Sequence, residues 1–108
     1  MYDYDNMPSL DWTGTSTVHH AKAQLLREEP VVLNMPGDFD FGVEDPEACG
    51  CMTDPESGIL YNCDPEGVLG ALAGRNRESD VGALMDAAVE SGSRVDVDVT
   101  GRRLILHD

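Results

Sequence analysis

The chain has 108 residues, of which 41% are hydrophobic and 26% charged, and its formal net charge is -14 at pH 7. This length is sufficient for one hydrophobic core and too short for two, and the negative charge excludes direct binding to nucleic acid or an anionic membrane, because both require a cationic surface. No apolar run approaches the roughly 20 residues that span a bilayer, and residues 1–10 lack the character of a signal peptide, so we expect a cytoplasmic protein.

The first 14 residues mix aromatic and acidic side chains without the periodicity of a helix or a strand. We therefore expect residues 1–14 to be a loose acidic and aromatic tail. A single domain is predicted over residues 15–108, because no linker or repeat divides that stretch.

An amphipathic helix is predicted near residues 17–29. Pro30 ends its pattern, and apolar residues recur at helical spacing at Val18, Ala21 and Leu25. His19 and His20 lie about 100° apart around this helix, so at most one of them can face a shared site.

Two short segments after this helix are predicted to pair as a hairpin. Residues 31–35 form an apolar run, and residues 38–43 alternate so that Phe39 and Phe41 would face the core. Pro36-Gly37 between the segments suits the central positions of a type II turn.

A surface loop, a strand and a second helix are predicted to follow. Residues 44–58 contain turn signals without periodicity, and residues 59–63 are typical of a short strand. Asp64-Pro65 then gives a cap and a first helical residue, and Gly74 is the expected end of the helix.

The C-terminal third gives the clearest pattern. A core-facing stripe predicts a helix over residues 80–92, and residues 94–99 and 102–107 alternate around the hairpin signal Thr100-Gly101. The pairs expected across this hairpin are Val97 with Leu104, Val95 with Leu106, and Asp98 with Arg103. The predicted fold class is α+β, a single small domain whose mostly antiparallel sheet of two hairpins plus one strand packs on about three helices.

The acidic residues are concentrated in the middle of the chain. Residues 28–74 contain eleven acids and no Lys or Arg, whereas residues 1–27 carry three acids against two bases and residues 75–108 seven against five. Adaptation to a salt-rich host should spread acids evenly, so the asymmetry supports a functional acidic face, whereas the acid-rich, lysine-poor composition supports adaptation, and both interpretations stay open. The expected contacts with a basic partner are Asp38, Asp40, Glu44, Asp45, Glu47, Asp54 and Glu56.

Three Asp-Pro-Glu units lie in this acidic stretch, beginning at Asp45, Asp54 and Asp64. Asp accepts hydrogen bonds from nearby backbone donors, Pro fixes φ, and Glu complements a nascent helix dipole. We therefore interpret each unit as a turn or a helix cap.

The cysteines and one histidine could together bind zinc as a tetrahedral site. The candidate ligands are Cys49, Cys51, Cys63 and His19, with His20 or His107 as alternatives to His19. The spacing departs from the paired knuckles of structural zinc sites, so no cofactor is expected unless it is zinc. A cytoplasmic setting favours free thiols over a stable disulfide.

No glycine-rich phosphate loop and no nucleophile-base arrangement is signalled, so we expect no enzymatic activity. The leading interpretation is a small binding protein that inhibits or regulates a basic protein, and its most specific form is a nucleic-acid mimic of the anti-restriction or anti-CRISPR kind. One alternative is a halophilic cytosolic domain whose acidity serves solubility. Another is a zinc-stabilised protein-interaction module.

Overall fold

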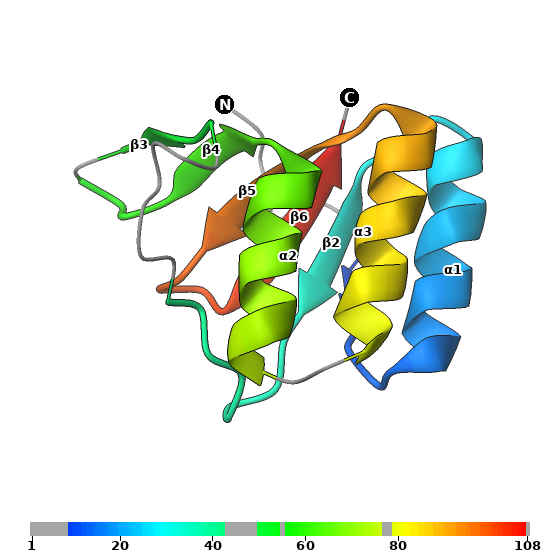
Figure 1. Cartoon of the computed structure of the whole chain (residues 1–108), viewed down its shortest axis with the longest axis horizontal. Coiled ribbons are helices and arrows are strands. Elements are labelled where there is room, and N and C mark those ends of the chain that lie inside the picture. Colours follow the sequence, from blue (N-terminus) through cyan, green and yellow to red (C-terminus); the bar gives the residue numbers. More distant parts are fainter. Residues whose placement is uncertain (1–8, 43–49, 55, 77–78, 108) are drawn as a thin grey trace.

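The computed structural model describes residues 9–42, 50–54, 56–76 and 79–107, which form one six-stranded sheet and three helices (Figure 1). The predicted α+β class with a mostly antiparallel sheet is confirmed. In chain order the elements are β1 (Ser9–Asp11), α1 (Thr15–Leu26), β2 (Val31–Asn34), β3 (Met52–Thr53), β4 (Leu60–Cys63), α2 (Pro65–Asn76), α3 (Ser79–Ser91), β5 (Arg94–Asp98) and β6 (Arg103–His107).

The strands follow the order β1-β2-β6-β5-β4-β3 across the sheet. β1 and β2 are parallel and connected through α1, while the other neighbours are antiparallel. All three helices cover the same face of the sheet, with α3 between α1 and α2 (Figure 1). None of the helices in the described ranges is long and apolar enough to cross a membrane.

The main core lies between this face and the helices. Strand alternation directs one side chain in two toward the helices, and each helix contributes an apolar stripe, represented by Ala21 in α1, Leu69 in α2 and Leu84 in α3. All three of these side chains are fully buried. Burial of one leucine stabilises the fold by about 1.5–3 kcal/mol, so the helical layer is held mainly by this contact.

The C-terminal hairpin has the predicted register. Val95 pairs with Leu106 and Val97 with Leu104, and all four side chains are fully buried in the core. The opposite face carries the predicted ion pair, with 2.7 Å between Arg103 Nη2 and an Asp98 carboxylate oxygen.

The predicted hairpin over residues 31–43 is wrong. β2 pairs with β1 and β6, and residues 38–42 form no strand. The chain leaves the sheet at Pro36, which has no N–H for a ladder, after Met35 has donated its N–H to the Arg102 carbonyl at 2.9 Å.

Part of the predicted tail belongs to the sheet. β1 pairs with β2, and the Trp12 N–H extends that pairing by donating to the Asn34 carbonyl at 2.8 Å. Trp12 and Leu10 pack against the core. β1 has only three residues, which are too few for the alternation of a strand to be recognised in the sequence. Residues 1–8 of the predicted tail lie outside the described residues.

Asp80 connects the beginnings of two helices. It lies in the first turn of α3, and its carboxylate accepts a hydrogen bond at 3.0 Å from the hydroxyl of Thr15, which is the first residue of α1. Gly14 precedes α1 with φ of 98°, and a Cβ there would approach the Asp80 carboxylate to 3.0 Å. A negative charge beside helix N-termini is favourable, so Asp80 stabilises the packing of α1 on α3.

We predict that Asp80→Ala lowers the free energy of unfolding by about 1–2 kcal/mol, because the Thr15 hydroxyl loses its acceptor and the dipole of α3 loses its charge. Asp86→Ala is the matched control, since Asp86 is exposed on the same helix, and it should change stability by no more than about 0.5 kcal/mol. Urea titration followed by circular dichroism measures both, and equal midpoints for the two variants would contradict the role of Asp80.

Candidate functional site

Residues 36–42, here called the Phe39 loop, carry two of the predicted partner contacts. Phe39 and Phe41 are buried, 7% and 6% exposed, and their rings meet edge to face with centroids 4.9 Å apart. Asp38 precedes Phe39, Asp40 lies between the two phenylalanines, and both acidic side chains are exposed. The predicted alternation of apolar and acidic side chains is therefore present, although the backbone is a loop.

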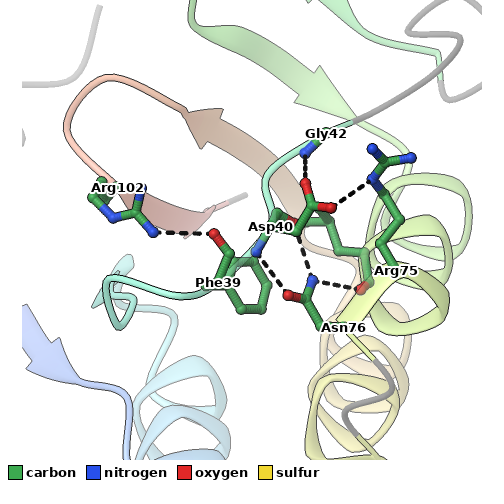
Figure 2. A network of polar contacts seen from close by, with 7 residues as sticks. Phe39, Asp40, Gly42, Arg75, Asn76 and Arg102 are labelled. Carbon is green, nitrogen blue, oxygen red and sulfur yellow. Dashed lines mark hydrogen bonds and ion pairs between the residues drawn. The ribbon is translucent and has the colours of Figure 1, made fainter.

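Arg102 holds this loop from the turn of the C-terminal hairpin. Its Nη2 group donates to the carbonyl oxygens of Pro36 at 2.9 Å, Gly37 at 2.8 Å and Phe39 at 3.0 Å. The guanidinium also lies over the Phe41 ring, 5.1 Å from its centroid, a contact in which the ring face attracts the cation. Figure 2 shows Arg102 reaching the loop from the side opposite α2.

The last turn of α2 holds the loop from the other side. Asn76 accepts the Asp40 N–H at 2.7 Å and donates to the Asp40 carbonyl at 3.0 Å, while it also donates to the Leu72 carbonyl at 2.8 Å (Figure 2). The Asp40 carboxylate accepts the Gly42 N–H at 2.8 Å and lies 3.4 Å from Arg75 Nε. The loop is thus fixed between two elements that are distant in sequence.

Two acidic side chains of the predicted interface therefore serve local structure. The Gly42 N–H lowers the pKa of Asp40 below its ordinary value; desolvation partly opposes this, and Arg75 lowers the pKa further. In the β3–β4 turn, the Glu56 N–H lowers the pKa of Asp54, together with the hydroxyl of Ser57. Asp54 accepts these hydrogen bonds at 3.0 and 2.8 Å, which is the turn geometry predicted for its Asp-Pro-Glu unit.

Other predicted contacts are exposed. Asp38 and Glu56 are exposed, and no basic side chain in the described ranges is paired with either of them. Glu44, Asp45 and Glu47 lie outside the described residues. Asp38 and Glu56 are therefore the described members of the predicted set that are available to a partner.

The Phe39 loop, the beginning of β4 and the turn of the C-terminal hairpin line a hollow of about 430 Å³. Its lining combines apolar side chains and backbone with two charged groups: Phe39, Asp40, Phe41, Gly42, Gly58, Leu60, Val99 and Arg102. The structure thus brings the loop close to the β3–β4 turn, from which Glu56 projects.

The basic side chains in the described part of the chain are all engaged by the protein itself. Three of them form ion pairs at 3.4–3.7 Å: Lys22 with Glu90, Arg27 with Glu29, and Arg75 with Asp40. Arg103 forms the closer pair with Asp98. Arg94 donates to the Asn62 carbonyl, and Arg102 donates to carbonyls of the Phe39 loop.

The predicted zinc ligands have different surroundings. Cys51 and Cys63 are joined in a disulfide, contrary to the expected free thiols, so neither offers a thiolate in this state. His19 is exposed on α1, and Cys49 lies outside the described residues. No group of three or more potential metal ligands occurs among the residues that the structure describes. Zinc binding by the reduced chain stays a prediction.

Sequence reasoning missed a buried polar pair on the face of the sheet away from the helices. His107 Nε2 lies 2.8 Å from an Asp96 carboxylate oxygen, and both side chains are buried. That oxygen also accepts the N–H of Asn62, whose φ of 54° marks an irregularity in β4. The alternation of side chains along β5 and β6 could have indicated this pair, because it places Asp96 and His107 on one face of the sheet.

We predict that Arg102→Met lowers the free energy of unfolding by about 1–3 kcal/mol, because the loop carbonyls lose a charged donor while an apolar stem remains over Phe41. Arg27→Met is the control, since Arg27 contacts only Glu29 across an exposed 3.5 Å pair, and should change stability by no more than about 0.5 kcal/mol. Urea unfolding gives both values. A stable Arg102 variant with unchanged Phe39 and Phe41 ring resonances would contradict the role of Arg102 in holding the loop.

The charge of Asp40 should stabilise the fold in a pH-dependent way. Because its pKa is lower in the folded than in the unfolded chain, this stabilisation is present above pH 4 and is lost as the pH falls through the folded value. Asp40→Asn should therefore be less stable than the wild type at pH 7, with the difference shrinking toward pH 2.5. Thermal melts at the two pH values, with Asp38→Asn as the control, measure it; a constant difference for Asp40→Asn would contradict the assignment.

Comparisons with protein-family models, with curated proteins and with solved structures give no match for this chain.

Proposed function

We propose that this chain is a non-enzymatic binding protein whose acidic surface, centred on the Phe39 loop, docks onto a basic protein and inhibits or regulates it. The observation that carries the proposal is that the basic side chains are bound within the chain while certain exposed acids have no basic partner. Every Lys and Arg in the described ranges is engaged by its own chain, whereas Asp38 and Glu56 are exposed and form no ion pair with a base in those ranges. The surface around the loop can therefore offer charge to a partner.

The loop geometry supports the proposal. Arg102 on one side and Asn76 on the other fix the backbone on both sides of Asp38. An ordered loop loses less conformational entropy on binding than a mobile one, so preorganised carboxylates bind more tightly at equal charge. The predicted contacts Glu44, Asp45 and Glu47 follow the loop in sequence and lie outside the described residues.

The partner of this surface is a protein with a basic face, such as one that binds nucleic acid. In that case the carboxylates would occupy the positions of phosphate groups, and the protein would act as a nucleic-acid mimic. Asp40 and Asp54 would contribute less than we predicted from sequence, because backbone and side-chain donors of the chain already bind them.

The test is capture of partners from host lysate at low salt, followed by affinity measurements of the captured basic proteins between 50 and 500 mM salt, conditions that span weak to strong screening. We expect affinity to fall steeply with salt, and Asp38→Asn with Glu56→Gln to weaken it. Asp86→Asn with Glu90→Gln removes the same charge from α3 and should have little effect. Equal losses for both pairs, or affinity independent of salt, would contradict the proposal.

A halophilic domain is the second candidate, favoured by exposed acids away from the loop. Glu28, Glu66 and Asp86 are exposed on other parts of the fold, and none of them is paired with a base in the described ranges. If acidity serves only solubility in brine, the chain should need molar salt to fold, because salt must screen its self-repulsion. Thermal melts across the same salt series distinguish the candidates: a binding protein folds in dilute buffer.

A further inference from the structure

The Cys51–Cys63 disulfide joins a short edge strand to the body of the sheet. β3 has two residues and comes last in the strand order, where β4 is its neighbour (Figure 1). Both of its side chains, Met52 and Thr53, are exposed, so β3 itself buries no side chain in the core. Because so short a pairing without buried side chains is at best marginally stable, we attribute the attachment of β3 to the sheet mainly to the disulfide.

The Cys63 end of the disulfide is held from the other side, by β5. The register between β4 and β5 shifts between Leu60 and Cys63, and Asn62 within that shift has φ of 54°. The Asn62 N–H donates to an Asp96 carboxylate oxygen at 2.8 Å, and the Asn62 carbonyl accepts a hydrogen bond from Arg94 at 2.6 Å. A bulge of this kind changes the direction of the side chains that follow it, and Cys63 is fully buried in the core.

The two sulfur atoms differ in their access to a reductant. Cys51 is half-buried, whereas Cys63 is inaccessible to solvent. The thiolate of a small dithiol therefore attacks Cys51 Sγ and forms a mixed disulfide, while the bond to Cys63 breaks and its electron pair leaves on Cys63 Sγ, which takes a proton. The second thiol of the reductant then closes on the first, and Cys51 leaves and is protonated. The protein gains two electrons and two protons, and the dithiol becomes a disulfide.

We propose that Cys51 and Cys63 form a reversible redox switch, which attaches β3 to the sheet when oxidised and releases it when reduced. The rest of the fold remains in the reduced state, because a free cysteine in a core behaves as a small apolar side chain and β5 still holds β4. Release of β3 makes β4 the edge strand on this side of the sheet, with backbone groups free to pair. The switch is independent of the proposed function, since it requires no partner.

The switch is tested on the full chain carrying Cys49→Ser, so that Cys51 and Cys63 are its two cysteines. The chain is equilibrated with reduced or oxidised dithiothreitol in buffer that contains a metal chelator, and ¹⁵N relaxation gives the backbone order parameters in each state. We expect those of Met52 and Thr53 to fall from about 0.85 to below about 0.6 on reduction and to recover on reoxidation. The order parameters of β5 and β6 should stay unchanged.

Cys51→Ser in the same background is the matched control, because it cannot form the disulfide and leaves Cys63 in the core. Its β3 residues should show the low order parameters of the reduced chain, with and without reductant. Global unfolding of the reduced chain would make the disulfide a structural crosslink and overturn the switch. Equal order of β3 in the two redox states, or failure of oxidised dithiothreitol to restore the bond, would also overturn it.

Discussion

The contacts of Arg102 connect the Phe39 loop with the turn of the C-terminal hairpin. One guanidinium bonds three carbonyls of the Phe39 loop and lies over Phe41. Without this donor the Pro36 carbonyl would keep the Phe39 N–H as a partner, whereas the loop would lose the bonds to the Gly37 and Phe39 carbonyls that connect it with the C-terminal hairpin. Arg102 has φ of 57°, so its position also depends on the tight turn of the C-terminal hairpin.

Local patterns predicted the elements whose contacts are also local. Thr100-Gly101 sets the turn between β5 and β6, and strand alternation then determines that Val97 faces Leu104 and that Asp98 meets Arg103. The Phe39 loop shows the limit of this reasoning. Alternation correctly predicted the burial of Phe39 and Phe41, but strand pairing was wrong because partners far away in sequence, Asn76 and Arg102, hold the backbone instead.

The cysteine pairing shows the same limit. β3 pairs with β4 so that Met52 lies opposite Tyr61, which would place Asn62, rather than Cys63, opposite Cys51. Asn62 adopts a left-handed conformation, its N–H bonded to Asp96 and its carbonyl to Arg94. This irregularity accompanies the bond between Cys63 and Cys51. Residue spacing could not reveal it, because the residues that hold Asn62 come from another strand.

Carboxylates in this chain therefore have two different physical roles, which composition cannot separate. Asp40 and Asp54 bind backbone N–H groups within two residues of themselves, so their charge stabilises turns, and transferring those bonds to a partner would bring little net gain. Asp38 and Glu56 have no such donors in the described ranges and keep their charge exposed. The count of acids in residues 28–74 thus overstates the charge available for recognition, because some of these carboxylates are already bound within turns. Long-range attraction to a basic partner would come from the carboxylates that stay exposed, whereas those bound by the N–H groups of the chain itself would contribute little to it.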